Sequence, residues 1–198
     1  FDRMAVGSHL PRYNSLVVLT HFKGHTQGGF GGSNKNIGIG CADGRIGKAW
    51  IHTTPGQDDQ WDIAKEEFME RMTESTKAVV DHFGRHITYV NVMRNMSVSC
   101  DCEGLAAAPV VTPNVGILSS TDILALDQAC VDLVYAMTEA EHHDLVERIE
   151  SRHGLRQLSY MKELGMGNDR YVLIDLDNGG KRITPAEAVK DLKPFVAE

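Results

Sequence analysis

The sequence predicts an α/β protein with a mixed, largely parallel sheet and helices packed on its faces. Three observations lead to this class. Apolar, β-branched runs alternate with amphipathic segments of helical period, turn residues separate the two kinds of segment, and 198 residues are enough for a full core. We therefore expect a single domain over residues 1–198. Because the chain starts at Phe1 and not at methionine, we expect it to be a fragment of a longer chain.

The first half of the chain contains the clearest alternation. Residues 16–20 form an apolar run that predicts a buried strand, and residues 87–93 alternate between apolar and polar positions, which also favours a strand. Between them, residues 62–83 have apolar positions at helical spacing and end before Gly84, which is a typical helix stop. Residues 42–60 are polar and rich in turn residues, so we expect a loop there.

The second half continues the same order of elements. Asp122 is a predicted helix cap, and Thr138 with Glu141 forms a predicted capping box. Pro185 is favourable at the first position of a helix. The predicted strands cover residues 115–119 and 171–176, and the predicted helices cover residues 122–137, 138–152 and 154–164, with a short one from residue 184.

Candidate metal ligands lie in two loops that are far apart in the sequence. His21 and His25 follow the first predicted strand, and Cys41 ends the glycine-rich segment after them. The alternative for the two histidines is that one packs at the strand end and the other forms a hydrogen bond with the backbone. Cys100 and Cys102 flank an aspartate in the second loop. Imidazole and thiolate suit a transition metal such as zinc or iron. We expect the two loops to close over one pocket, with these five side chains as metal ligands.

The spacing of Cys100 and Cys102 leaves two interpretations open. In an extended strand their Cα atoms would lie roughly 6.6 Å apart. A disulfide usually needs ~4.4–6.8 Å and converging Cβ vectors, so either a disulfide or chelation of one metal requires a bend. The alternative is a pair of buried thiols beside a loop acid. Cys130, on an apolar helix face, is expected in the core.

The glycine-rich segment also suits an anion. Lys23 and Lys35 supply positive charge, and the backbone N–H groups around Gly31, Gly32 and Asn34 can form a concave nest. The N-terminus of a following helix would add its dipole. We therefore predict an anion site at Gly31, Gly32, Asn34 and Lys35, the alternative being a tight turn that packs against the sheet.

Two residues are candidates for the chemistry itself. We expect Lys23 to act beside the bound anion and Asp101 to serve as a proton acceptor or an oxygen ligand. Asp127, in the predicted helix 122–137, is open to two interpretations: it lines the site, or it satisfies a loop.

Three ordered segments resemble the family catalogued as domain of unknown function 362. They are residues 21–41 (HFKGHTQGGFGGSNKNIGIGC), Cys100-Asp101-Cys102, and residues 115–133 (VGILSSTDILALDQACVDL); residues 154–174 also look like that family's C-terminal end. Members are often labelled uncharacterised iron–sulfur-centre proteins, and many carry a ferredoxin-like insertion with two four-cysteine clusters, which implies electron transfer. In this chain the corresponding place, between His52 and Trp61, holds only a short polar loop. No iron–sulfur cluster is therefore expected within this chain.

The composition argues against two classes of binding partner, nucleic acids and membranes. A net charge of -7 argues against nucleic-acid binding, which needs a basic face. No stretch has the uninterrupted apolar length of a membrane span, so we expect no membrane partner. The four cysteines contain no Cys-x-x-Cys spacing, and a reducing, cytoplasmic setting is expected.

Three functions remain open. The first is a metal-dependent or redox enzyme that acts on a small anionic substrate. The second is an electron-transfer or scaffold module that works with a separate ferredoxin-like iron–sulfur protein. The third is a phosphate- or nucleotide-binding protein without a metal.

Overall fold

The computed structural model describes residues 1–53 and 63–196, and its central feature is a three-stranded sheet. The sheet has the order β1 (Leu16–His21), β4 (Ile87–Met93) and β5 (Gly116–Ser120). Strands β1 and β4 are parallel, with Leu16 opposite Ile87, whereas β4 and β5 are antiparallel. The predicted mixed α/β class is confirmed, with the parallel pairing confined in this sheet to β1 and β4.

Most helices and strands lie close to their predicted positions. Asp122 accepts a hydrogen bond from the Ala125 N–H at 2.9 Å, and Thr138 with Glu141 forms the predicted capping box. Pro185 opens the last helix. The helices are α1 (Ser33–Gly40), α2 (Gly47–His52), α3 (Lys65–Phe83), α4 (Ile123–Ala136), α5 (Glu139–Ser151), α6 (Arg156–Glu163) and α7 (Pro185–Val189), with 3-10 helices η1 (Leu10–Arg12) and η2 (Asp101–Ala106). Two further hairpins pair β2 (Lys23–His25) with β3 (Gly29–Gly31) and β6 (Leu173–Asp175) with β7 (Lys181–Ile183).

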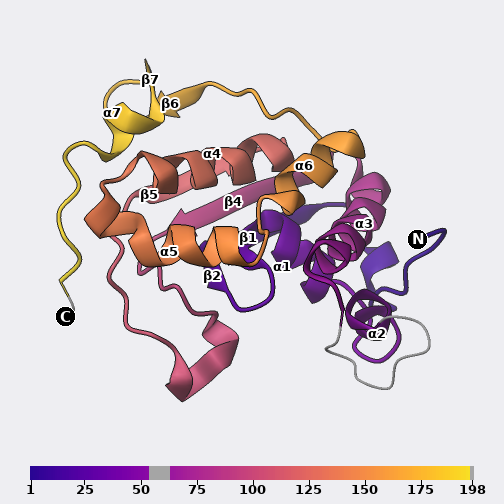
Figure 1. Cartoon of the computed structure of the whole chain (residues 1–198). Helices are drawn as coiled ribbons and strands as arrows, with labels where there is room; N and C mark the ends of the chain where they lie inside the picture. Colours follow the sequence, from indigo (N-terminus) through magenta and orange to yellow (C-terminus); the bar gives the residue numbers. More distant parts are fainter. Residues whose placement is uncertain (54–62, 197–198) are drawn as a thin grey trace.

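The two faces of the sheet differ in what covers them. Helix α1 packs on β1, and α4 lies across β4 and β5 (Figure 1). Side chains that point towards these helices are buried along β4 and partly buried along β5, because successive residues of a strand point to opposite faces. On the other face, Val17, Leu19 and Ile117 are 70%, 67% and 66% exposed.

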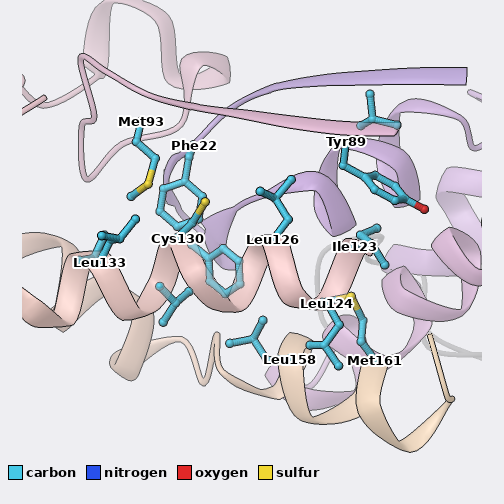
Figure 2. Packing of buried hydrophobic residues seen from close by; sticks show 14 of the residues in the cluster. Phe22, Tyr89, Met93, Ile123, Leu124, Leu126, Cys130, Leu133, Leu158 and Met161 are labelled. Atoms are coloured by element: carbon cyan, nitrogen blue, oxygen red, sulfur yellow. The ribbon is translucent and has the colours of Figure 1, made fainter. Parts of the chain in front are cut away.

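Helix α4 forms the middle layer of the core. Figure 2 shows its residues Ile123, Leu126 and Cys130 on the side of the sheet, and Leu124 on the side of α6. Cys130 is fully buried there, as predicted. The labelled partners of α4 in this packing are Phe22, Tyr89 and Met93 from the sheet side and Leu158 and Met161 from α6.

Helix α1 follows directly on the glycine-rich turn, and helix α2 lies in a predicted loop. Helix α1 contains Gly38 and Gly40, which disfavour a helix on propensity alone. A Cβ at Gly38 would lie 2.5 Å from the Met72 carbonyl oxygen of α3, so the glycine allows the two helices to pack closely. Helix α2 forms inside the predicted loop 42–60. The polar loop between His52 and Trp61 and the predicted start of α3 at residue 62 lie outside the described residues.

The length and apolar character of the helices bear on whether one of them could span a membrane. None of those within residues 1–53 and 63–196 is long and apolar enough to cross a bilayer.

Candidate metal site

The β2–β3 hairpin holds His25 in a defined orientation. His25 pairs with Gly29 across the hairpin, and its Nδ1 accepts hydrogen bonds from the N–H groups of Gly28 at 2.9 Å and Gln27 at 3.3 Å. An accepting nitrogen carries a lone pair, so the proton of the neutral ring lies on Nε2. The side chain is buried, and its orientation therefore depends on the turn of the hairpin.

A close backbone contact brings the cysteine-containing loop onto this hairpin. The Gly24 N–H donates to the Ser97 carbonyl oxygen at 2.8 Å. A Cβ built at Gly24 would lie only 2.0 Å from the Val98 carbonyl oxygen, a distance that real side chains do not adopt. Only glycine therefore allows the loop to lie against β2 in this way.

The chain bends between Cys100 and Cys102 because Cys100 is the N-cap of η2. The Cys100 N–H donates to Glu103 Oε1 at 2.7 Å, and Cys100 Sγ accepts from the Cys102 N–H at 3.4 Å, which together form a capping box. The two Sγ atoms lie 2.7 Å apart, and both cysteines are free thiols. Cys100 is 3% exposed, whereas Cys102 is an exposed residue.

The structure brings together three of the five predicted metal ligands. One ligand atom from each of His25, Cys100 and Cys102 lies within 4.8 Å of the other two. The hairpin supplies the imidazole and the start of η2 supplies the two sulfur atoms. Two loops that are separated by more than 70 residues thus meet at one point, as the sequence analysis expected.

His21 and Cys41 lie outside this group, so the predicted ligand set is reduced. His21 is the last residue of β1, and its Nε2 lies 2.8 Å from the Arg94 carbonyl oxygen. Cys41 is the C-cap of α1, where its N–H donates to the Ile37 carbonyl oxygen. Asp101 begins η2, and its role as a proton acceptor stays a prediction.

A pocket of about 180 Å³ contains most of the predicted anion-binding residues. The aliphatic carbons of Lys23 and Lys35 both approach Gly31, since a Cβ there would meet Lys35 Cδ at 3.6 Å and Lys23 Cε at 3.8 Å. Asn36 completes one wall through hydrogen bonds to the Leu19 carbonyl oxygen and to Thr20 Oγ1. The full lining is Leu19, Thr20, His21, Lys23, Gly31, Gly32, Lys35 and Asn36.

Asn34 and the N-terminus of α1 differ from the prediction. The N–H groups of Ser33 and Asn34 already donate to the two carboxylate oxygens of Asp127, at 2.8 and 2.9 Å. The Asn34 side chain is buried and donates to Thr73 and Gln157. An anion in the pocket would therefore depend on Lys23 and Lys35. Asp127, left open above, satisfies the start of α1.

Two supporting residues were not found from the sequence. Gln157 of α6 donates to the carbonyl oxygens of Gly28 at 2.8 Å and Phe30 at 3.1 Å, and so supports the hairpin that carries His25. It is 129 residues away from Gly28, and no local pattern indicates such a contact. Glu103 has a local signal, because an acid three residues after a cap is typical of a capping box.

One known protein family matches part of the chain. A family model described as Domain of unknown function (DUF362) matches residues 1–132. The chain belongs to this family. The match includes the hairpin, the cysteine-containing loop and Asp127, so the whole candidate site lies within the DUF362 region. No curated protein and no solved structure matches the chain. The association with iron–sulfur proteins, and the likeness of residues 154–174 to the family, stay predictions.

Burial and the positive charges around the DUF362 site keep His25 neutral. Burial is the main cause that lowers the pKa of His25 to about 3, and the positive charges of Lys35 and Lys23, with smaller effects of His52 and Arg148, act in the same direction. A neutral imidazole is the form that binds metals. For Cys102, partial burial and the hydrogen bond with Cys100 raise the pKa, while the charge of Lys35 opposes this.

The depressed pKa of His25 predicts that the metal-free domain loses stability in acid. The folded-state pKa is about 3 and that of an unfolded histidine is about 6.5, so the unfolded chain takes up the proton first. This contribution to stability is present above about pH 6.5 and is lost as the pH falls towards 3. Urea unfolding between pH 7 and pH 5 measures it. In His25→Asn, whose amide oxygen can replace Nδ1, stability should fall less over this range.

His143 provides the matched control for this prediction. It is exposed, and a hydrogen bond with Asp144 raises its pKa, so it does not cause a loss of stability in acid. His143→Asn should therefore not reduce the loss of stability in acid. Equal pH dependence in His25→Asn and the unsubstituted domain would contradict the assignment to His25.

Proposed function

We propose that this DUF362 domain binds a transition-metal ion, zinc or iron, between His25, Cys100 and Cys102, and acts on a small anion held in the adjacent pocket. The observation that carries the proposal is the approach of the three ligand atoms to within 4.8 Å of one another. Two thiolates and an imidazole select borderline-soft metals over magnesium or calcium. Three protein ligands leave a coordination position open, as is typical of catalytic sites.

The positions of the lysines support a shared site. Lys35 lines the pocket, and its charge also affects the pKa of both His25 and Cys102. The anion-binding part and the metal-binding part are therefore neighbours, connected through this residue. Lys23 and Lys35 would bind and orient a carboxylate or phosphate group. A bound metal would polarise the substrate or lower the pKa of a bound water.

His25 sets a condition on this proposal. The hydrogen bonds from Gly28 and Gln27 to Nδ1 leave the ring proton on Nε2. Ligation through Nε2 requires the other tautomer, in which the proton lies on Nδ1, and this tautomer must release the two backbone donors. Metal binding at this set therefore releases protons from the thiols, whereas the neutral ring keeps its single proton.

Metal titration of purified, metal-free protein tests the proposal. We expect one Zn²⁺ per chain, and with Co²⁺ an absorption band that reports thiolate ligation. Cys102→Ser should weaken that band, because one of the two thiolates is removed, and should weaken Zn²⁺ binding by more than the roughly 10–100-fold that loss of a supporting residue costs. Cys41→Ser makes the same chemical change outside the group and should bind as the unsubstituted protein does. No binding of Zn²⁺, Co²⁺ or Fe²⁺, or an equal loss in both variants, would contradict the proposal.

The same pocket favours a second candidate, a metal-free protein that binds phosphate or a nucleotide. Its two lysines suit an anion whether or not a metal is present. A ligand that binds only the folded state raises the unfolding temperature. Stabilisation by phosphate or nucleotides that is unchanged by a chelator would favour this candidate over the metal-dependent one.

A further inference from the structure

We infer that Cys100 and Cys102 also form a redox-active dithiol, which closes to an intrachain disulfide by exchange with a small disulfide such as oxidised glutathione. The inference uses the same two sulfur atoms as the proposed metal site, but it does not require that a metal binds. It adds a second chemical state to the DUF362 site.

The first argument is the distance between the thiols. Their Sγ atoms are 2.7 Å apart, and a disulfide bond is about 2.05 Å long. The remaining movement is a fraction of an ångström, which side-chain rotation supplies. An extended Cys-x-Cys segment would hold the two Cα atoms at the edge of the usable range. Here the start of η2 bends the chain between them and turns both side chains to the same side.

The second argument is that the loop is held in this bend from both sides. On the side of η2, the Cys100 N–H donates to Glu103 at 2.7 Å. On the other side, Ser99 Oγ accepts from the Ala108 N–H at 2.9 Å, and Ser97 Oγ donates to the Ala108 carbonyl oxygen at 2.8 Å. The two sulfur atoms are therefore kept close together without a bond between them, which lowers the entropy lost when the bond forms.

The third argument is the unequal exposure of the two thiols. Cys102 is exposed and meets a disulfide from solvent, whereas Cys100 is buried behind it. The thiolate of Cys102 attacks one sulfur of the small disulfide, forms a mixed disulfide and releases one thiol. The thiolate of Cys100 then attacks Cys102 Sγ and releases the second thiol. The dithiol loses two electrons and two protons, and the small disulfide gains them.

The other thiols of the described chain are placed differently. Cys130 is fully buried in the core on α4, and Cys41 ends α1 outside the group. Oxidation should therefore be confined to one loop. If the proposed metal site is correct, it follows that the disulfide form does not bind the metal, because both sulfur ligands are used up.

Thiol mapping of the metal-free full chain tests the inference. The protein is incubated with reduced and oxidised glutathione, alkylated, and digested after Arg94 and after Glu103. This gives a peptide of residues 95–103 whose only cysteines are Cys100 and Cys102. We expect oxidation to remove both alkylation sites of this peptide together, with the loss of two hydrogen masses, and to leave Cys41 and Cys130 unchanged.

Two variants separate the roles of the thiols. In Cys100→Ser the mixed disulfide between glutathione and Cys102 should accumulate, because the second thiol that removes it is absent. In Cys102→Ser the buried Cys100 should remain largely unmodified. A stable glutathione adduct on Cys102 in the unsubstituted protein, or two thiols that stay alkylatable under oxidising conditions, would overturn the inference.

A final arm distinguishes this inference from the proposed function. Zn²⁺ is added to the reduced protein and to the oxidised protein, and binding is measured in each. A disulfide without Zn²⁺ binding by the reduced form would support the inference and count against the metal site. Zn²⁺ binding without disulfide formation would support the metal site and count against the inference. Binding by the reduced form alone supports both.

Discussion

Replacing Gly24 by alanine should abolish metal binding at His25, Cys100 and Cys102, although none of these ligands is changed. A Cβ at this position would lie 2.0, 2.5 and 2.8 Å from the carbonyl oxygen, carbonyl carbon and Cα of Val98. These are backbone atoms, so the cysteine-containing loop itself must move. A shift of about an ångström exceeds the roughly 0.2 Å tolerance of metal–ligand distances. The domain should lose roughly 1–3 kcal/mol of stability as well, as is typical of overpacking.

Cobalt absorption and thermal unfolding measure the two effects in parallel. Gly44→Ala is the matched control, because a Cβ there meets nothing within 4 Å. It should bind metal and unfold like the unsubstituted protein. A Gly24→Ala protein that is folded by circular dichroism and still shows the thiolate–cobalt band would show that the contact with Val98 does not hold the site together.

The second large effect is expected for Asp127→Asn, which should lower the free energy of unfolding by about 3 kcal/mol. Asp127 is fully buried and accepts from the N–H groups of Ser33 and Asn34 and from Asn91 Nδ2, all within 2.9 Å. Burial raises the pKa of this carboxyl, and the three donors act in the opposite direction. Asparagine keeps the shape but replaces one acceptor oxygen by an NH₂ group that faces a donor.

Asp132→Asn on the same helix is the control for this substitution. Asp132 is half-buried and accepts from Gln128 at 2.8 Å and Tyr171 at 2.7 Å, so its loss should cost below about 1.5 kcal/mol. Urea unfolding of both variants gives the comparison. Asp127 holds the start of α1, which follows directly on the pocket residues Gly31 and Gly32. Asp127→Asn should therefore also weaken anion binding in the pocket. Equal destabilisation by both substitutions would show that the contacts with α1 contribute little.

Local patterns were reliable for elements whose signal lies within a few residues. The strand 87–93 has the predicted bounds, because alternation of apolar and polar residues matches its one buried and one less buried face. Asp122, Thr138 and Pro185 mark helix starts as predicted, since a cap involves only the neighbouring turn. Propensity alone is a poor guide for α1, where close packing of Gly38 on α3 outweighs the low helix propensity of glycine.

For the candidate site, the sequence predicts the kinds of residue but not which of them meet, because the contacting residues are far apart in the sequence. Residue chemistry alone predicted a site of imidazole, thiols and lysines in two loops, and the structure brings His25, Cys100 and Cys102 of these loops together. Which of them meet was decided by contacts such as that of Gly24 with Val98, together with the bend that η2 introduces after Cys100. Tertiary packing also separated Cys41 from the other ligands and assigned the N-terminus of α1 to Asp127. Such contacts join residues dozens of positions apart, and their energy depends on distances that a local pattern does not contain.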